Sequence, residues 1–218
     1  MQPGSVSGFT RASGALAIVA AAALATACGG GGTSESFPLG DPAADDGDRS
    51  PGEVQIHVPK GWYLGDLAAT GAVPPGPETS LFLADESVVP EDIADAAADD
   101  PASREEFSGH LGDGGLITII IAGEQSCTGV TENLERRVSG FRTGVPGGEI
   151  TEPDDTIGDE GTLVSGVDSG AALNAYSASL PLRDDLCRGL LISSTGPADQ
   201  QDRLGEIVAE VARKSRLS

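Results

Sequence analysis

The amino-acid sequence predicts an α+β fold in which helices pack on a mostly antiparallel sheet. Two observations support this prediction. The elements indicated by the apolar pattern follow in the order strand, strand, helix, strand, helix, three strands, helix. A turn sequence, Asp168-Ser169-Gly170, joins two of these strands as a hairpin. Hairpins with interspersed helices are typical of antiparallel sheets with helices packed on them.

The elements of the amino-terminal half are short. Residues 53–58 alternate between apolar and polar side chains, which predicts a half-buried strand. A second strand is expected over residues 80–84, and residues 89–111 are helix-like but broken by Pro101. The strongest strand covers residues 115–122. Because it is apolar on both faces, we expect it to be central and covered on both sides.

The carboxyl-terminal half is richer in strands. An amphipathic helix is expected over residues 130–141, where apolar side chains recur every three or four residues. Three strands follow at residues 161–167, 171–180 and 190–194. A last helix is expected to begin near Pro197, a residue that suits the first helical position. Basic residues in its last turn favour the negative end of the helix dipole.

Acidic residues dominate the composition. The 34 Asp and Glu against 13 Lys and Arg give a formal net charge of −21. This charge argues against sequence-independent nucleic-acid binding, which needs basic residues to displace counterions from phosphates. It also argues against electrostatic docking on anionic lipid. The excess is greatest in residues 35–106, where 17 acids oppose 3 bases, so this part is the expected face for a basic partner, if the protein has one.

The amino terminus has the pattern of an export signal. Residues 1–14 carry a single charge, Arg11, and the uncharged run Ala15–Ala27 follows. As a helix this run rises about 20 Å, short of the roughly 30 Å hydrocarbon core of a bilayer. We therefore expect residues 1–27 to be a signal peptide and not a spanning anchor.

The run ends in Leu24-Ala25-Thr26-Ala27-Cys28-Gly29, which resembles the lipobox of bacterial lipoproteins. In that family a small residue precedes an invariant cysteine, and leucine is preferred where this chain has Ala25. The resemblance implies that Cys28 is acylated, that the chain is cut before it, and that the lipid holds the protein at the extracytoplasmic face of the cell membrane. The alternative is an ordinary secretory signal cut after Ala25 or Ala27, which leaves Cys28 as a free thiol.

The cysteine count fits the lipoprotein interpretation. The chain has three cysteines, Cys28, Cys127 and Cys187, and an odd number in an exported protein leaves one thiol to explain. If Cys28 is acylated, Cys127 and Cys187 form a natural pair, and exported compartments permit a disulfide. The alternative is two buried free thiols. A metal site is disfavoured, because neither residue has a cysteine or histidine at ligand spacing.

Residues 28–52 are predicted to be a flexible tether rich in Gly and Asp. Low hydrophobicity with high charge does not offset the entropy lost on ordering. A flexible coil of this length spans roughly 25–30 Å root-mean-square, which would hold a domain clear of a lipid surface. Residues 53–218 are expected to form a single exported domain.

This domain carries a second resemblance. The opening Val58-Pro59-Lys60-Gly61-Trp62, an acylated export signal, a Gly/Asp linker, and two late strands before a closing helix are similar to the Mog1/PsbP-like lipoproteins of actinobacteria. The resemblance implies a sandwich of helices on a sheet and an accessory, binding or assembly role. That family is generally non-catalytic, so it implies no catalytic residues and no cofactor.

The histidines offer little catalytic chemistry. His57 falls on the polar face of the first strand and is expected to be exposed. His110 could act as a general base with a serine and Asp113, which would make the protein a cell-envelope hydrolase. No Gly-x-Ser-x-Gly elbow accompanies it, since Gly166-Val167-Asp168-Ser169-Gly170 has its serine in the fourth place.

Carboxylates and aromatic residues supply the remaining candidates. The acidic groups around residues 91–100 and 152–160 could hold Ca²⁺ weakly, but solvated charge is the favoured interpretation, and no metal is assigned. Trp62 and Tyr63 are weak candidates for ligand binding. On extended backbone such neighbours point to opposite faces, which makes one a core anchor.

These observations together predict a membrane-anchored exported lipoprotein that is not an enzyme. Its domain would bind a small ligand or an unknown envelope protein, with no nucleic acid as partner. The alternatives are the hydrolase using His110 and a carrier of lipid or a small molecule. The carrier requires a sizeable enclosed cavity between sheet and helices.

Overall fold

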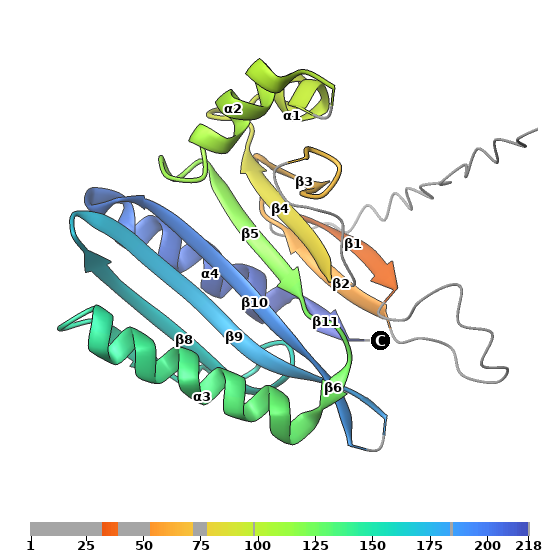
Figure 1. Ribbon diagram of the computed structural model, residues 1–218, viewed down its shortest axis with the longest axis vertical. Helices are drawn as coiled ribbons and strands as arrows, with labels where there is room; N and C mark the ends of the chain where they lie inside the picture. The colour runs from red at the N-terminus through yellow and green to blue at the C-terminus, as the bar shows by residue number, and fades with distance from the viewer. Residues whose placement is uncertain (1–31, 39–52, 72–77, 98, 184, 218) are drawn as a thin grey trace, which may run out of the picture.

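The computed structural model describes residues 32–38, 53–71, 78–97, 99–183 and 185–217. Two antiparallel sheets and four helices make up the described part (Figure 1), so the predicted α+β class is confirmed. The large sheet contains, in spatial order, β3 (Trp62–Asp66), β4 (Thr79–Asp85), β5 (Leu116–Ile121), β10 (Leu186–Pro197), β9 (Ala171–Arg183), β8 (Asp159–Asp168) and β7 (Glu149–Thr151), with β6 (Gln125–Ser126) added to β10.

A smaller sheet and the helices complete the architecture. The smaller sheet has the order β1 (Thr33–Pro38), β2 (Glu53–Val58) and β11 (Arg216–Leu217). The helices are α1 (Glu91–Ala97), α2 (Pro101–Gly109), α3 (Cys127–Gly144) and α4 (Gln201–Lys214), with a 3₁₀ turn at Ala198–Gln200. In Figure 1, α3 and α4 lie on opposite sides of the large sheet, and α1 and α2 lie beyond one end of β4 and β5.

Strand β5 is the centre of the core, as the sequence predicted. It pairs with β4 on one side and β10 on the other. Ile117, Ile119 and Ile121 are fully buried in the main core with Val208 and Val211 of α4. On the other face, Leu116 is buried against the α1–α2 pair, whereas the middle of the strand is only half-buried. The two faces are therefore covered to different extents.

Local sequence explains how several elements begin and end. Ser169 and Gly170, with φ of 49° and 87°, connect β8 to β9 as a two-residue hairpin loop, which confirms the predicted turn. The Asp100 side chain caps α2, and Pro101 begins this helix instead of breaking a longer one. Pro197 is extended and ends β10, so the 3₁₀ turn and then α4 begin after it, later than predicted.

The prediction of a flexible tether over residues 28–52 is wrong for its middle. Residues Thr33–Pro38 form β1, which pairs antiparallel with β2 over six residues, from Thr33 opposite Val58 to Pro38 opposite Glu53. The open edge of β2 offers unpaired backbone groups, and Phe37 packs against the main core. These non-local contacts offset the low hydrophobicity of the segment.

The predicted signal peptide 1–27, Cys28 and the remainder of the tether lie outside the described residues. Cys127 and Cys187 form a disulfide with their Cα atoms 4.8 Å apart, as predicted. This disulfide ties the start of α3 to β10 and packs with Val130 and Leu134. Within the described ranges, no helix is both long and apolar enough to cross a membrane.

The expectation that His57 is exposed is wrong. The residue is only 6% exposed, because Glu210 of α4 and the chain at Gly32 lie against its ring. Its backbone N–H donates to Ser215 Oγ (3.0 Å), and its Nε2 lies 3.2 Å from Glu210 Oε1. Lys214 Nζ donates to the same Glu210 oxygen at 2.6 Å. Burial lowers the pKa of His57, and so does Lys214, while Glu210 opposes both effects.

This environment makes folding stability depend on pH. Because the folded pKa of His57 is lowered, the unfolded chain takes up its proton more readily. Stability is therefore complete above the unfolded pKa of about 6.5 and falls as the pH drops below it. We expect the urea midpoint to decrease from pH 7 toward pH 5, and His57→Asn to flatten this slope. His110→Asn is the matched control. An unchanged slope in the His57 variant would contradict this assignment.

Candidate functional site

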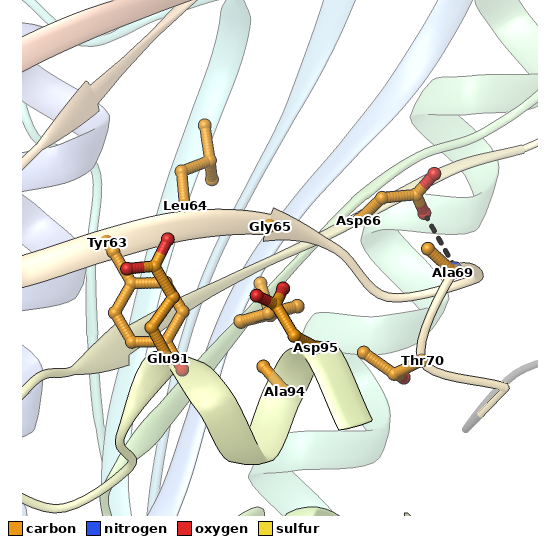
Figure 2. A pocket seen from close by; sticks show the side chains of 10 residues that line it. Tyr63, Leu64, Gly65, Asp66, Ala69, Thr70, Glu91, Ala94 and Asp95 are labelled. Atoms are coloured by element: carbon orange, nitrogen blue, oxygen red, sulfur yellow. Dashed lines mark hydrogen bonds between the residues drawn. The ribbon is translucent and has the colours of Figure 1, made fainter. Parts of the chain in front are cut away.

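The candidate site is a pocket of about 170 Å³ between β3, the turn that follows it, and α1 (Figure 2). It brings together residues that are distant in the sequence. The pocket is lined by Tyr63, Leu64, Gly65, Asp66, Ala69, Thr70, Phe82, Glu91, Ala94 and Asp95.

The two aromatic candidates point to opposite faces of β3, as predicted. Trp62 is 8% exposed and belongs to the main core, with the Arg203 guanidinium 5.8 Å from its ring centroid. Tyr63 packs against the second core cluster, under α1 and α2, and lines the pocket. Trp62 is therefore the core anchor and Tyr63 the residue available to a ligand.

Three aromatic rings, those of Tyr63, Phe82 and Phe107, pack in a row beside the pocket. Tyr63 meets Phe82 edge-on, with centroids 5.8 Å apart and an interplanar angle of 86°. Phe82 in turn meets Phe107 of α2 at 5.0 Å. The Phe82 ring lies across Gly65, where an added Cβ would overlap its atoms. Glycine at this position thus lets the ring reach the pocket.

Burial and nearby carboxylates keep the Tyr63 hydroxyl protonated. The hydroxyl donates to the Pro90 carbonyl oxygen at 3.4 Å. Burial, followed by the charges of Glu91 and Asp95, raises the pKa of Tyr63 to about 12. At neutral pH the site therefore presents a neutral phenol and an electron-rich ring face.

Carboxylates surround the opening of the pocket. In Figure 2, Glu91 and Asp95 extend from α1 toward β3, on either side of the space beside Tyr63. Asp66 lies at the far end, and its Oδ1 accepts a hydrogen bond from the Ala68 backbone N–H at 2.8 Å. A cation would meet opposite charge here together with an aromatic ring. The sequence located the acidic excess in residues 35–106 but not its proximity to Tyr63, because α1 and β3 are brought together only by packing.

A second hollow of about 270 Å³ lies between α3 and the sheet, where Ile120, Leu134, Arg137 and Leu191 are among its lining residues. Both hollows are smaller than the roughly 300–1,000 Å³ typical of pockets for drug-sized ligands. They suit a small group or a side chain. The carrier alternative, which requires a large enclosed cavity, gains no support from them.

His110 is held in place by one carboxylate. Its Nδ1 lies 2.7 Å from Asp113 Oδ2, and Asp113 Oδ1 accepts from the Gly115 backbone N–H at 3.1 Å. Among the residues that the structure describes, no serine or threonine hydroxyl is hydrogen-bonded to the imidazole. The pair has the geometry of a base and its orienting acid but shows no nucleophile. The hydrolase remains a prediction.

The described acidic side chains near residues 91–100 and 152–160 are not arranged as ligands of a metal ion. In the described part of the chain, no group of three His, Cys, Asp or Glu side chains is placed to hold a metal ion. Asp100 instead caps α2, accepting from the Ser103 hydroxyl at 2.7 Å.

Comparisons with known proteins give little guidance. No protein-family model matches the chain, and no curated protein is similar to it in sequence. A solved structure with similarity is that of LpqN, involved in cell envelope biogenesis of Mycobacterium tuberculosis, at 11% sequence identity and a TM-score of 0.39. The similarity covers 85% of this chain and 91% of that one. A TM-score this low supports no conclusion about function.

The packing under the pocket is open to a direct test. We expect Gly65→Ala to lower the free energy of unfolding by about 1–3 kcal/mol, because the new methyl group forces the Phe82 ring to move. Urea unfolding of the purified domain measures this change. Gly123→Ala is the matched control, since an added Cβ there meets nothing within 4 Å. Equal stability of the two variants would show that Phe82 is not held against Gly65.

Proposed function

We propose that this chain is an exported lipoprotein, anchored at the extracytoplasmic face of the cell membrane through an acylated Cys28. Its domain binds a ligand or partner without catalysing a reaction. The proposal combines the lipobox-like sequence before Cys28 with the disulfide and the pocket beside Tyr63.

The disulfide is the observation that carries the proposal. Of three cysteines, Cys127 and Cys187 are bonded to each other, which leaves Cys28 as the thiol without a disulfide partner in the domain. Disulfides persist in oxidising compartments outside the cytoplasm. Cys28 is also the residue that follows the apolar run and a small residue, where a lipoprotein carries its acyl group.

The pocket indicates the kind of group that is bound. Glu91 and Asp95 place negative charge beside the Tyr63 ring, and none of the described residues that line the pocket is basic. An ammonium or guanidinium group fits this combination, because it gains both ion pairing and contact with the ring face. We therefore propose that the domain binds a cationic ligand or a basic side chain of a partner protein.

Lipidation is tested by metabolic labelling with a fatty-acid probe in the native host. We expect wild-type protein to carry the label and Cys28→Ala to lose it, because the thioether needs the Cys28 sulfur. The double variant Cys127→Ala/Cys187→Ala is the control and should remain labelled. Equal labelling of wild type and Cys28→Ala would refute the anchor.

Cation binding is tested with a fluorescent oligolysine peptide by anisotropy. We expect Glu91→Gln/Asp95→Asn to weaken binding about tenfold or more, since two carboxylates beside the ring are lost. Glu105→Gln/Glu106→Gln on α2 is the matched control, because it removes the same charge away from the pocket. Equal weakening by both pairs would show that net charge, and not this pocket, attracts the peptide.

A further inference from the structure

The start of β1 determines where the chain enters the domain. Because Thr33 lies opposite Val58, the chain enters at the end of β2 that leads into the Pro59-Lys60-Gly61 turn. Gly32, just before β1, packs closely there. A Cβ added to Gly32 would lie 2.7 Å from Val58 O and 2.9 Å from His57 Nε2.

This entry point is very close to Cys28 along the chain. Four residue steps separate Cys28 from Gly32, and at full extension they reach about 14 Å. A domain of this size is about 40 Å across. We assume here, with the proposed function, that Cys28 carries the lipid. The segment between Cys28 and Gly32 is then shorter than the domain is wide, so the side of the domain opposite Gly32 cannot reach the bilayer. Strand β1 thus replaces a long tether with a short one.

The surface around Gly32 also has a distinctive charge. The two lysines of the chain, Lys60 and Lys214, are both exposed and both close to this point. Lys60 follows Val58 by two residues. Lys214 is linked to His57 through Glu210, which accepts from Lys214 Nζ at 2.6 Å and lies 3.2 Å from His57 Nε2.

Acidic residues outnumber basic residues in the chain as a whole, so a site with exposed lysines differs from the average surface. The chain has a net charge of −21, which disfavours contact between an average part of its surface and anionic lipid. Lys60 provides positive charge where the bilayer is nearest, and Lys214, which is also paired with Glu210, lies beside it. Arg213 and Arg216, on either side of Lys214 and Ser215, are exposed as well.

We propose that the surface formed by Gly32, Lys60 and Lys214 faces the bilayer and that its lysines contact anionic lipid headgroups. This inference rests on the proposed anchor at Cys28 and adds an orientation to it. The end of the domain that carries the β8–β9 hairpin then lies away from the membrane. In Figure 1 this hairpin is at the left of the molecule, whereas β1 and β2 lie on the right.

The orientation is tested with the full-length lipidated protein in phosphatidylglycerol vesicles that contain headgroup-nitroxide lipid. A fluorophore is attached to a single free thiol, introduced either as Thr33→Cys in β1 or as Asp168→Cys at the hairpin. Both positions are exposed. We expect several-fold stronger quenching at position 33 than at position 168. Equal quenching at the two positions would overturn the proposal.

Two further variants separate the short connection from the lysines. Inserting about twelve Gly and Ser residues before Thr33 raises the root-mean-square reach of the connection from roughly 11 Å to roughly 22 Å and should reduce the difference in quenching. Lys60→Glu should reduce quenching at position 33 more than Arg142→Glu, an equal charge change on α3. No effect of the spacer would overturn the role of the short connection, and equal effects of the two charge variants would overturn the lysine contact.

Mass spectrometry of the same sample distinguishes the two proposals. If residue 28 carries no acyl mass, the proposed anchor itself fails. If it is acylated and quenching is nevertheless uniform, only the orientation fails.

Discussion

The fold depends on covering strand β5 on both faces. Ile117, Ile119 and Ile121 point to one face, and each fully buried side chain of this size contributes about 1.5–3 kcal/mol. Helix α4 and the smaller sheet cover that face continuously. The other face is covered at one end by α1 and α2, whereas α3 packs mainly over the neighbouring strands β8, β9 and β10. This divided covering creates hollows at the edges of the helices, and the pocket beside Tyr63 is one of them.

The disulfide links helix α3 to β10, the strand that pairs with the central strand β5. Cys187 lies near the start of β10, the strand that pairs with β5, and Cys127 is the first residue of α3. The bond therefore fixes the position of α3 on the less covered face. Because 60 residues separate the two cysteines, the chain-entropy model assigns about 4 kcal/mol to this cross-link. Aromatic residues are few in this chain, so a covalent link supplements a modest core.

Strand β1 connects the anchoring hypothesis with the fold. A polar amino-terminal segment that only linked lipid and domain would leave the body free to rotate. Once Thr33–Pro38 pairs with β2, the segment becomes part of the domain, and Phe37 adds to its core. The same pairing covers one edge of β2, and β1 becomes the edge strand of the smaller sheet. One structural feature thus serves stability and, in the proposed anchoring, orientation.

The sequence by itself determined the features that depend on local pattern. Apolar and polar alternation located β2, the apolar run located β5, Asp168-Ser169-Gly170 located the hairpin, and the odd cysteine count, taken with the lipobox resemblance at Cys28, indicated that Cys127 and Cys187 pair. Only the tertiary structure decided that β1 exists, that His57 is buried, and that Glu91 and Asp95 lie beside Tyr63. Each of these depends on contacts between segments far apart in the chain. Side-chain periodicity reports which face of a strand is apolar, but it cannot report which distant element will cover the other face.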